Sequence, residues 1–103
     1  MTQQDRSYAS GNWLVTEGKQ DEFVARWTEF LGWTRANAPG LVHAFLIRDD
    51  GESRHFVSFA LWSDAASRGV WKQQDGFAEH LGACRALCEE FAGSDFELAA
   101  EVS

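Results

Sequence analysis

The stretch from Arg54 to Trp62 alternates between two faces, and both faces carry apolar side chains. One face holds Phe56, Ser58, Ala60 and Trp62, and the other holds Val57, Phe59 and Leu61. A strand with one face in water alternates apolar with polar residues, so this pattern predicts a strand covered on both sides. Ser63 and Asp64 then favour a helix start, and a short helical segment follows as far as Trp71.

The first third of the chain reads as a strand followed by a long helix. Ser7 to Thr16 alternates, with Asn12 on the same face as Tyr8 and Ser10. Gly11 weakens this strand and marks a bulge or the close approach of another group. Apolar positions then recur every three to four residues, which predicts a helix from about Gln20 to Asn37.

The remaining pattern predicts two more strands and one more helix. Leu41 to Arg48 reads as a strand that turns back into the Arg54 strand as an antiparallel hairpin. A helix is expected from Phe77 to Phe91, because its apolar residues are spaced four, three, four and three apart. Asp95 to Val102 alternates again and is expected to form the last strand.

The resulting order is β-α-β-β-α-β, with the second helical unit split in two. This order is typical of the ferredoxin-like α+β fold, a four-stranded antiparallel sheet with helices on one face. We expect a single domain over residues 1–103, with an ordered core at about residues 7–102. The open face of the sheet is also apolar, so we expect a homodimer in which two sheets pack together.

Composition and charge limit the classes of binding partner that we expect for this protein. The net charge of −7, without a cluster of Lys or Arg among the aromatic residues, argues against nucleic-acid binding. No apolar run approaches the ~20 residues that span a bilayer. The first residues, MTQQDRSY, lack a signal-peptide pattern, so we expect a cytoplasmic protein. Five Trp and eight Phe residues are many for 103 residues, which indicates that some rings lie in an interface or a ligand cavity.

Three residues of the sequence are candidate metal ligands. His80, Cys84 and Cys88 lie four residues apart along one side of the expected helix. Such ligands suit soft metals, but on a straight helix the three span about 12 Å, at a rise of about 1.5 Å per residue. They cannot converge on one ion, so we expect no metal and predict reduced core thiols.

A family resemblance emerges from three segments: Gly18 through Phe23 and Trp27, then Pro39-Gly40, then FVSFALWSDAASRGVWKQQDGF. Together they resemble the antibiotic biosynthesis monooxygenase family, over roughly Ser7 to Val102. The resemblance implies a dimeric ferredoxin-like fold whose two sheets form a barrel. It also implies a ligand cleft between sheet and helices in each subunit.

One group in that family oxidises polycyclic phenols to quinones with molecular oxygen and without metal or flavin. The resemblance implies an important Asn on the third strand, with an important Trp four residues later. Trp62 matches the Trp position, but Ser58 stands where the Asn is expected. A serine hydroxyl offers one hydrogen-bond donor where an amide offers two.

A second group cleaves haem, with an Asn on the first strand, a Trp in the short helix and a His ligand in the next helix. Trp71 matches that Trp, whereas Asn12 and His80 are each displaced by one residue. A slip of one residue on a strand reverses the face, and on a helix it rotates the side chain by about 100°. Haem cleavage is therefore the third hypothesis.

The first hypothesis is a cofactor-independent monooxygenase acting on an aromatic or polycyclic phenol. Trp62 would form a wall of the site, and Ser58 and Asn12 would donate hydrogen bonds to the phenolate or peroxide. A base is missing unless the phenol ionises unaided or His80 serves. The expected substrate-binding residues are Phe23, Trp27, Phe56, Trp71, Phe77 and His80.

The second hypothesis is a non-catalytic dimer whose hydrophobic cleft binds a small aromatic ligand, since one fold can host both roles. Core packing is the competing explanation for Trp62, Trp27 and Phe23. Asn12 also has a competing explanation as a solvent-facing or backbone-bonded residue. A cavity filled by Trp27 and Trp62 would favour a purely structural role for both rings.

Overall fold

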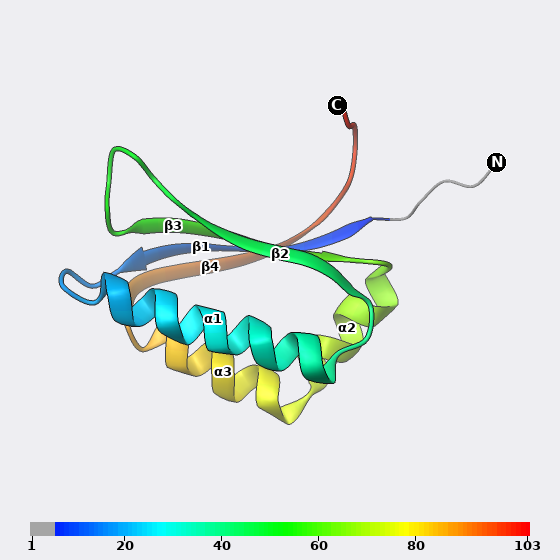
Figure 1. Ribbon diagram of the computed structural model, residues 1–103, viewed down its shortest axis with the longest axis horizontal. Helices are drawn as coiled ribbons and strands as arrows, with labels where there is room; N and C mark the ends of the chain where they lie inside the picture. Colours follow the sequence, from blue (N-terminus) through cyan, green and yellow to red (C-terminus); the bar gives the residue numbers. More distant parts are fainter. Residues whose placement is uncertain (1–5) are drawn as a thin grey trace.

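The computed structural model describes residues 6–103. Residues 1–5, which begin the segment MTQQDRSY that lacks a signal-peptide pattern, lie outside the described residues. One antiparallel sheet is formed in the order β2-β3-β1-β4. All helices cover the same face of this sheet (Figure 1), which confirms the ferredoxin-like α+β fold. The elements are β1 (Ser7–Val15), α1 (Gln20–Asn37), β2 (Leu41–Arg48), β3 (His55–Trp62), α2 (Ala65–Gln73), α3 (Asp75–Arg85) and β4 (Cys88–Glu97).

The split of the second helical unit has local causes. The Asp64 carboxylate caps α2 by accepting a hydrogen bond from the Ser67 backbone N–H at 2.7 Å, as the sequence predicts for this pair. The same hydrogen bond lowers the pKa of the Asp64 carboxyl. Gln74 adopts an extended backbone conformation between α2 and α3, so the two helices meet at an angle rather than as one rod.

The expected boundary between the last helix and the last strand is wrong. The helix ends at Arg85 instead of Phe91, and the strand runs from Cys88 to Glu97 instead of Asp95 to Val102. Cys88 and Phe91 continue the helical spacing by coincidence, which concealed the turn. Residues 88–91 form a strand and not a helix because β4 pairs with β1 from Val15 back to Ser7. This pairing satisfies backbone groups of β1 that would otherwise form an open edge.

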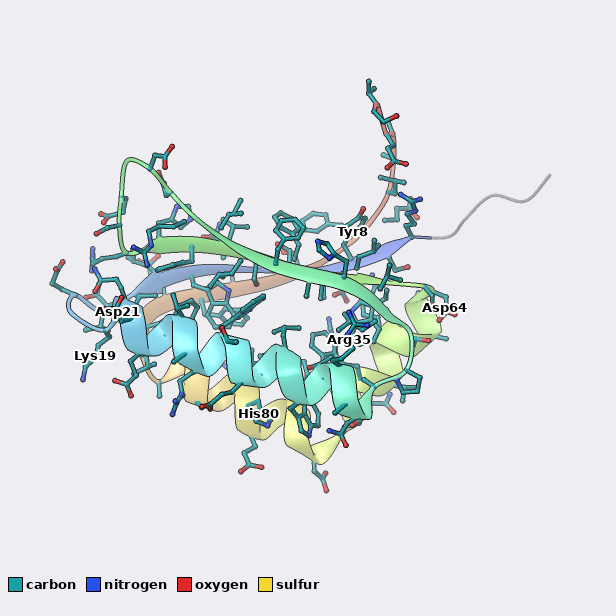
Figure 2. All side chains as sticks on the ribbon, in the orientation of Figure 1. Tyr8, Lys19, Asp21, Arg35, Asp64 and His80 are labelled. Atoms are coloured by element: carbon teal, nitrogen blue, oxygen red, sulfur yellow. The ribbon has the colours of Figure 1, made fainter. Side chains whose placement is uncertain are left out.

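The two faces of β3 are those that the sequence predicts. Phe56, Ser58, Ala60 and Trp62 are buried toward the helices, whereas the alternate residues are only half-buried. On the opposite, open face lie three large apolar side chains with substantial exposure: Phe45 at 40%, Ile47 at 51% and Phe96 at 52%. Tyr8 projects from this face, away from the helices (Figure 2). Within residues 6–103, no helix is long and apolar enough to cross a membrane.

Candidate functional site

A cavity of about 290 Å³ lies between the helix-facing side of the sheet and the helices. Its floor comes from β1, β3 and β4, and its roof from all three helices. Three tryptophans and four phenylalanines are among the lining residues: Trp13, Trp27, Trp71, Phe30, Phe59, Phe77 and Phe91. A concave, mainly apolar hollow with a few polar groups is the usual form of a small-molecule site.

The floor is hollow because two neighbouring rows of the sheet carry mostly small side chains, with Asp95 at the edge strand as the exception. Residues directly opposite each other in an antiparallel pair share one face, so each row crosses β3, β1 and β4. The first row is Ser58, Gly11 and Gly93, and the second is Ala60, Ala9 and Asp95. The adjoining row is entirely aromatic, namely Phe56, Trp13 and Phe91. The step from aromatic to small residues therefore creates the space.

A hydrogen bond fixes the polar group on this floor. The indole Nε1–H of Trp13 donates to Oγ of Ser58 at 3.0 Å, and both residues are buried. Because Oγ accepts this bond, the Ser58 hydroxyl can still donate its own hydrogen to an acceptor in the cavity. Ser58 thus provides a pre-oriented donor within an aromatic environment.

Gly11 makes room for that hydrogen bond. A Cβ atom at Gly11 would lie 2.5 Å from Nε1 of Trp13 and 2.8 Å from Oγ of Ser58. The expected close approach of another group is therefore confirmed, whereas the alternative, a bulge at Gly11, is wrong. The register shift of β1 against β4 falls between Leu14 and Val15 instead.

Trp71 of α2 contacts residues of both other helices in the roof, Thr34 of α1 and Phe77 of α3. Its Nε1–H donates to Oγ1 of the fully buried Thr34 at 2.9 Å, and Thr34 in turn donates to the Phe30 carbonyl. The Phe77 ring meets Trp71 edge-on, with 4.7 Å between ring centroids. Trp27, Trp71 and Phe77 line the cavity, so the structure brings together three of the six expected substrate-binding residues.

Trp62 lies behind Trp71 and not at the surface of the cavity. The side chain is 0% exposed and packs against Trp71, with 4.8 Å between ring centroids, but it does not line the cavity. Its Nε1–H is buried without a hydrogen-bond partner in the part of the chain that the structure describes. The placement agrees with the core-packing explanation, and any influence of Trp62 on a ligand acts through Trp71.

Asn12 is on the opposite side of the sheet from Ser58. It pairs with Val57 on the open face, and its Oδ1 lies 2.8 Å from Nε2 of His55. Nδ1 of His55 is 2.8 Å from Oδ2 of Asp49, and this hydrogen bond is the main cause of the lowered pKa of the Asp49 carboxyl. Asn12 and Ser58 therefore cannot act on the same ligand atom within one subunit.

The other three expected substrate-binding residues also lie outside the cavity lining. Phe23 and Phe56 are buried in the core, 5.1 Å apart at their centroids. His80 is in the helix layer (Figure 2), where its ring stacks on Phe30 at 6.0 Å and lies 5.1 Å from Trp33. His80 is thus not placed to act as a base, and the arrangement expected for haem cleavage, with Asn12 and His80 in one pocket, does not form.

Among the lining residues that the sequence did not single out as site residues are Trp13, Phe30, Leu31, Leu81, Phe91 and Lys72. Trp13 shares a face with Gly11 in the alternation of the first strand, which was a usable signal. Phe30, Leu31 and Leu81 belong to the apolar helical faces, where spacing cannot separate core from cavity. Phe91 was assigned to the wrong element.

The two cysteines behave as core residues. Cys84 is fully buried and Cys88 is half-buried, and neither is in a disulfide. Burial raises the pKa of Cys84 to about 12, with a further contribution from Cys88, and it raises the pKa of Cys88 to about 11. Both thiols stay protonated at neutral pH, so they are poor nucleophiles.

The family model described as antibiotic biosynthesis monooxygenase matches residues 8–83, well over half of the chain. No curated protein is similar enough in sequence to match. Among solved structures, SnoaB of Streptomyces nogalater, described as a cofactor-independent oxygenase, is 24% identical over 96% of each chain, with a TM-score of 0.78.

Two further structures show the same fold at lower identity. One is described as an antibiotic biosynthesis monooxygenase and is 18% identical, covering 93% of this chain and 99% of its own, with a TM-score of 0.74. The other, a protein of Shewanella oneidensis, is 18% identical over 93% of each chain, with a TM-score of 0.79.

Substitution of Gly11 tests the floor of the cavity. We expect Gly11→Ala to lower the free energy of unfolding by about 1–3 kcal/mol, because its methyl group would push Trp13 away from Ser58. Gly32→Ala is the matched control, since a Cβ there meets nothing within 4 Å in α1. That control should be neutral or stabilising by up to about 1 kcal/mol. Urea unfolding measures both; equal behaviour of the two variants would contradict the tight contact.

Proposed function

Because the chain belongs to the antibiotic biosynthesis monooxygenase family, we propose that it oxidises a phenolic, fused-ring ligand with molecular oxygen and without a cofactor. The observation that carries this proposal is the Ser58 hydroxyl, held by Trp13 on the floor of an aromatic cavity. The similarity to SnoaB, described as a cofactor-independent oxygenase, supports the same reaction class.

The size of the cavity favours a ligand of two or three rings. An apolar cavity of about 150 Å³ is sufficient to bind benzene, and the cavity here is about 290 Å³. The surrounding rings offer both faces and edges to a flat aromatic system, which suits stacked and edge-on contacts.

The reaction we propose draws its electrons from the ligand itself. An ionised anthrone-type phenol transfers electrons to O₂, and a C–O bond forms at the activated ring carbon to give a peroxide. Loss of the outer oxygen as water, together with the two hydrogens of the original CH₂ group, leaves a quinone carbonyl. Four electrons move from carbon to oxygen, so no external reductant is needed.

Ser58 acts on the negative charge that this sequence moves from phenolate to peroxide. A fixed donor in a water-poor, low-dielectric site stabilises such charge more strongly than water does. The hydrogen bond from Trp13 polarises the Ser58 hydroxyl and so strengthens its donation. Within residues 6–103, the cavity lining holds no Asp, Glu or His, so the ligand is expected to bind already ionised.

Oxygen uptake by the metal-free protein with an anthrone tests this proposal. We expect Ser58→Ala to lower kcat by about 10²-fold to 10³-fold, the usual effect of removing one such donor. The matched control is Ser53→Ala, which removes an exposed hydroxyl from the turn between β2 and β3 and should leave kcat unchanged.

A second candidate, a binding protein without catalysis, is favoured by the missing base and by the single donor at Ser58. It predicts that the anthrone binds in the cavity while oxygen uptake stays at the level of the buffer. That result would contradict the monooxygenase proposal. Wild-type turnover that disappears in Ser58→Ala would contradict the binding-only proposal.

We further propose that the protein is a homodimer formed through the open face of the sheet. Its exposed apolar residues, Phe45 and Ile47 on β2 and Phe96 on β4, are unfavourable in water and suit a second sheet. Phe45 also contacts Phe59 across β2 and β3, with 5.2 Å between centroids, which extends the patch onto β3. No helix covers this face in Figure 1.

A charge placed on the open face should separate the subunits. We expect Ile47→Glu to elute as a monomer in size-exclusion chromatography with light scattering, because a dimer would bury the new carboxylate. Val70→Glu is the matched control, since Val70 is 57% exposed but belongs to α2 in the helix layer. A monomeric wild type, or a dimer that persists in Ile47→Glu, would argue against this interface.

A further inference from the structure

Lys72 is the one charged side chain that lines the cavity, as far as the structure describes the chain. It follows Trp71 in α2, and its side chain is 38% exposed, so it reaches from the aromatic interior to solvent. Lysine is suited to this position because its four-carbon stem can lie along apolar surface while its ammonium group stays in water. Lys72 therefore marks the mouth of the cavity.

The charges at this mouth are unequal. Nζ of Lys72 and Nε of Arg68 lie 2.5 Å and 3.8 Å from the same oxygen, Oδ1 of Asp95. Arg68 is further fixed because its Nη1 donates to the backbone carbonyls of Tyr8 and Phe96. Two cations thus share one carboxylate, although the chain as a whole has a net charge of −7. This mouth carries a local excess of positive charge.

We infer that the aromatic ligand carries an anionic substituent, such as a carboxylate, and that Lys72 binds it at the mouth of the cavity. The inference rests on the proposed function in so far as the same cavity holds the aromatic rings. Lys72 can leave Asp95 for the ligand at little cost, because Arg68 remains beside Asp95 and the lysine stem is flexible.

The anionic substituent is distinct from the reacting phenolic oxygen. Ser58 belongs to β3, whereas Asp95, which holds Lys72, belongs to β4, with β1 between the two strands. Neighbouring strands lie about 4.8 Å apart, so the two polar groups lie on strands about 10 Å apart across the sheet. A ligand with fused rings spans such a distance, and one polar group at each end would fix its orientation.

A matched pair of probes tests this role: 9-anthracenecarboxylate and the neutral 9-anthracenemethanol, which share the same three rings. Titration calorimetry gives the dissociation constant of each. For the wild type we expect the carboxylate to bind about tenfold more tightly, because a charge-assisted hydrogen bond is stronger than a neutral one. Lys72→Met should abolish this preference and leave the affinity for the alcohol unchanged, whereas Lys72→Arg should retain it.

Lys19→Met is the matched control, because Lys19 is the only other lysine and lies at the start of α1, outside the cavity lining. It changes the net charge equally and should keep the tenfold preference. Equal affinities for the two probes in the wild type, or a preference that survives in Lys72→Met, would overturn the role of Lys72 while leaving the aromatic cavity intact. Failure of both probes to bind would overturn this inference together with the proposed function.

Discussion

The hydrogen bond between Trp13 and Ser58 is the interaction on which the site depends. It joins β1 to β3 on the helix-facing side and requires a glycine between them, since any Cβ at Gly11 would displace one partner. It also affects what Ser58 can do: the oxygen accepts from Trp13, and the hydroxyl hydrogen stays free to donate to a ligand. The bond from Trp13 therefore favours Ser58 as a hydrogen-bond donor to a ligand, a role that its place in the sequence does not reveal.

Around this bond, the sheet alternates between rows of rings and rows of small side chains. The aromatic row containing Trp13 belongs to the core, and the neighbouring row at Gly11 and Gly93 leaves space above it. Above the space, Thr34 holds the indole of Trp71 so that the roof does not collapse onto the floor. An apolar ligand would recover the dispersion contacts that this empty volume forgoes.

The fold could be predicted well from the sequence because it rests on local alternation and spacing. The two faces of β3, the break after Asp64 and the β-α-β-β-α-β order all follow from such patterns. The last boundary could not be predicted, because Cys88 and Phe91 fit a helical stripe as well as a strand. Only the pairing with β1 decides between them, and that is a long-range interaction.

The site was less predictable than the fold, because its geometry also depends on long-range interactions. Ser58, Trp27, Trp71 and Phe77 could be selected from strand and helix patterns together with the family resemblance. Trp62 could not be separated from Trp71, since which of two packed rings meets the cavity depends on tertiary packing. The pairing of Trp13 with Ser58 requires the register of β1 against β3, and the role of Lys72 requires the position of Asp95 on the edge strand.

We propose that Ser58 donates to the oxygen of an aromatic ligand in this cavity. A crystal structure of the protein with a bound fused-ring phenol is the most direct measurement. We expect the rings to lie between the small-residue floor and Trp71, with the phenolic oxygen within about 2.5–3.0 Å of Oγ of Ser58, the range of O–H···O hydrogen bonds. A ligand bound on the open face of the sheet, or rings in the cavity with no polar atom near Ser58, would contradict it.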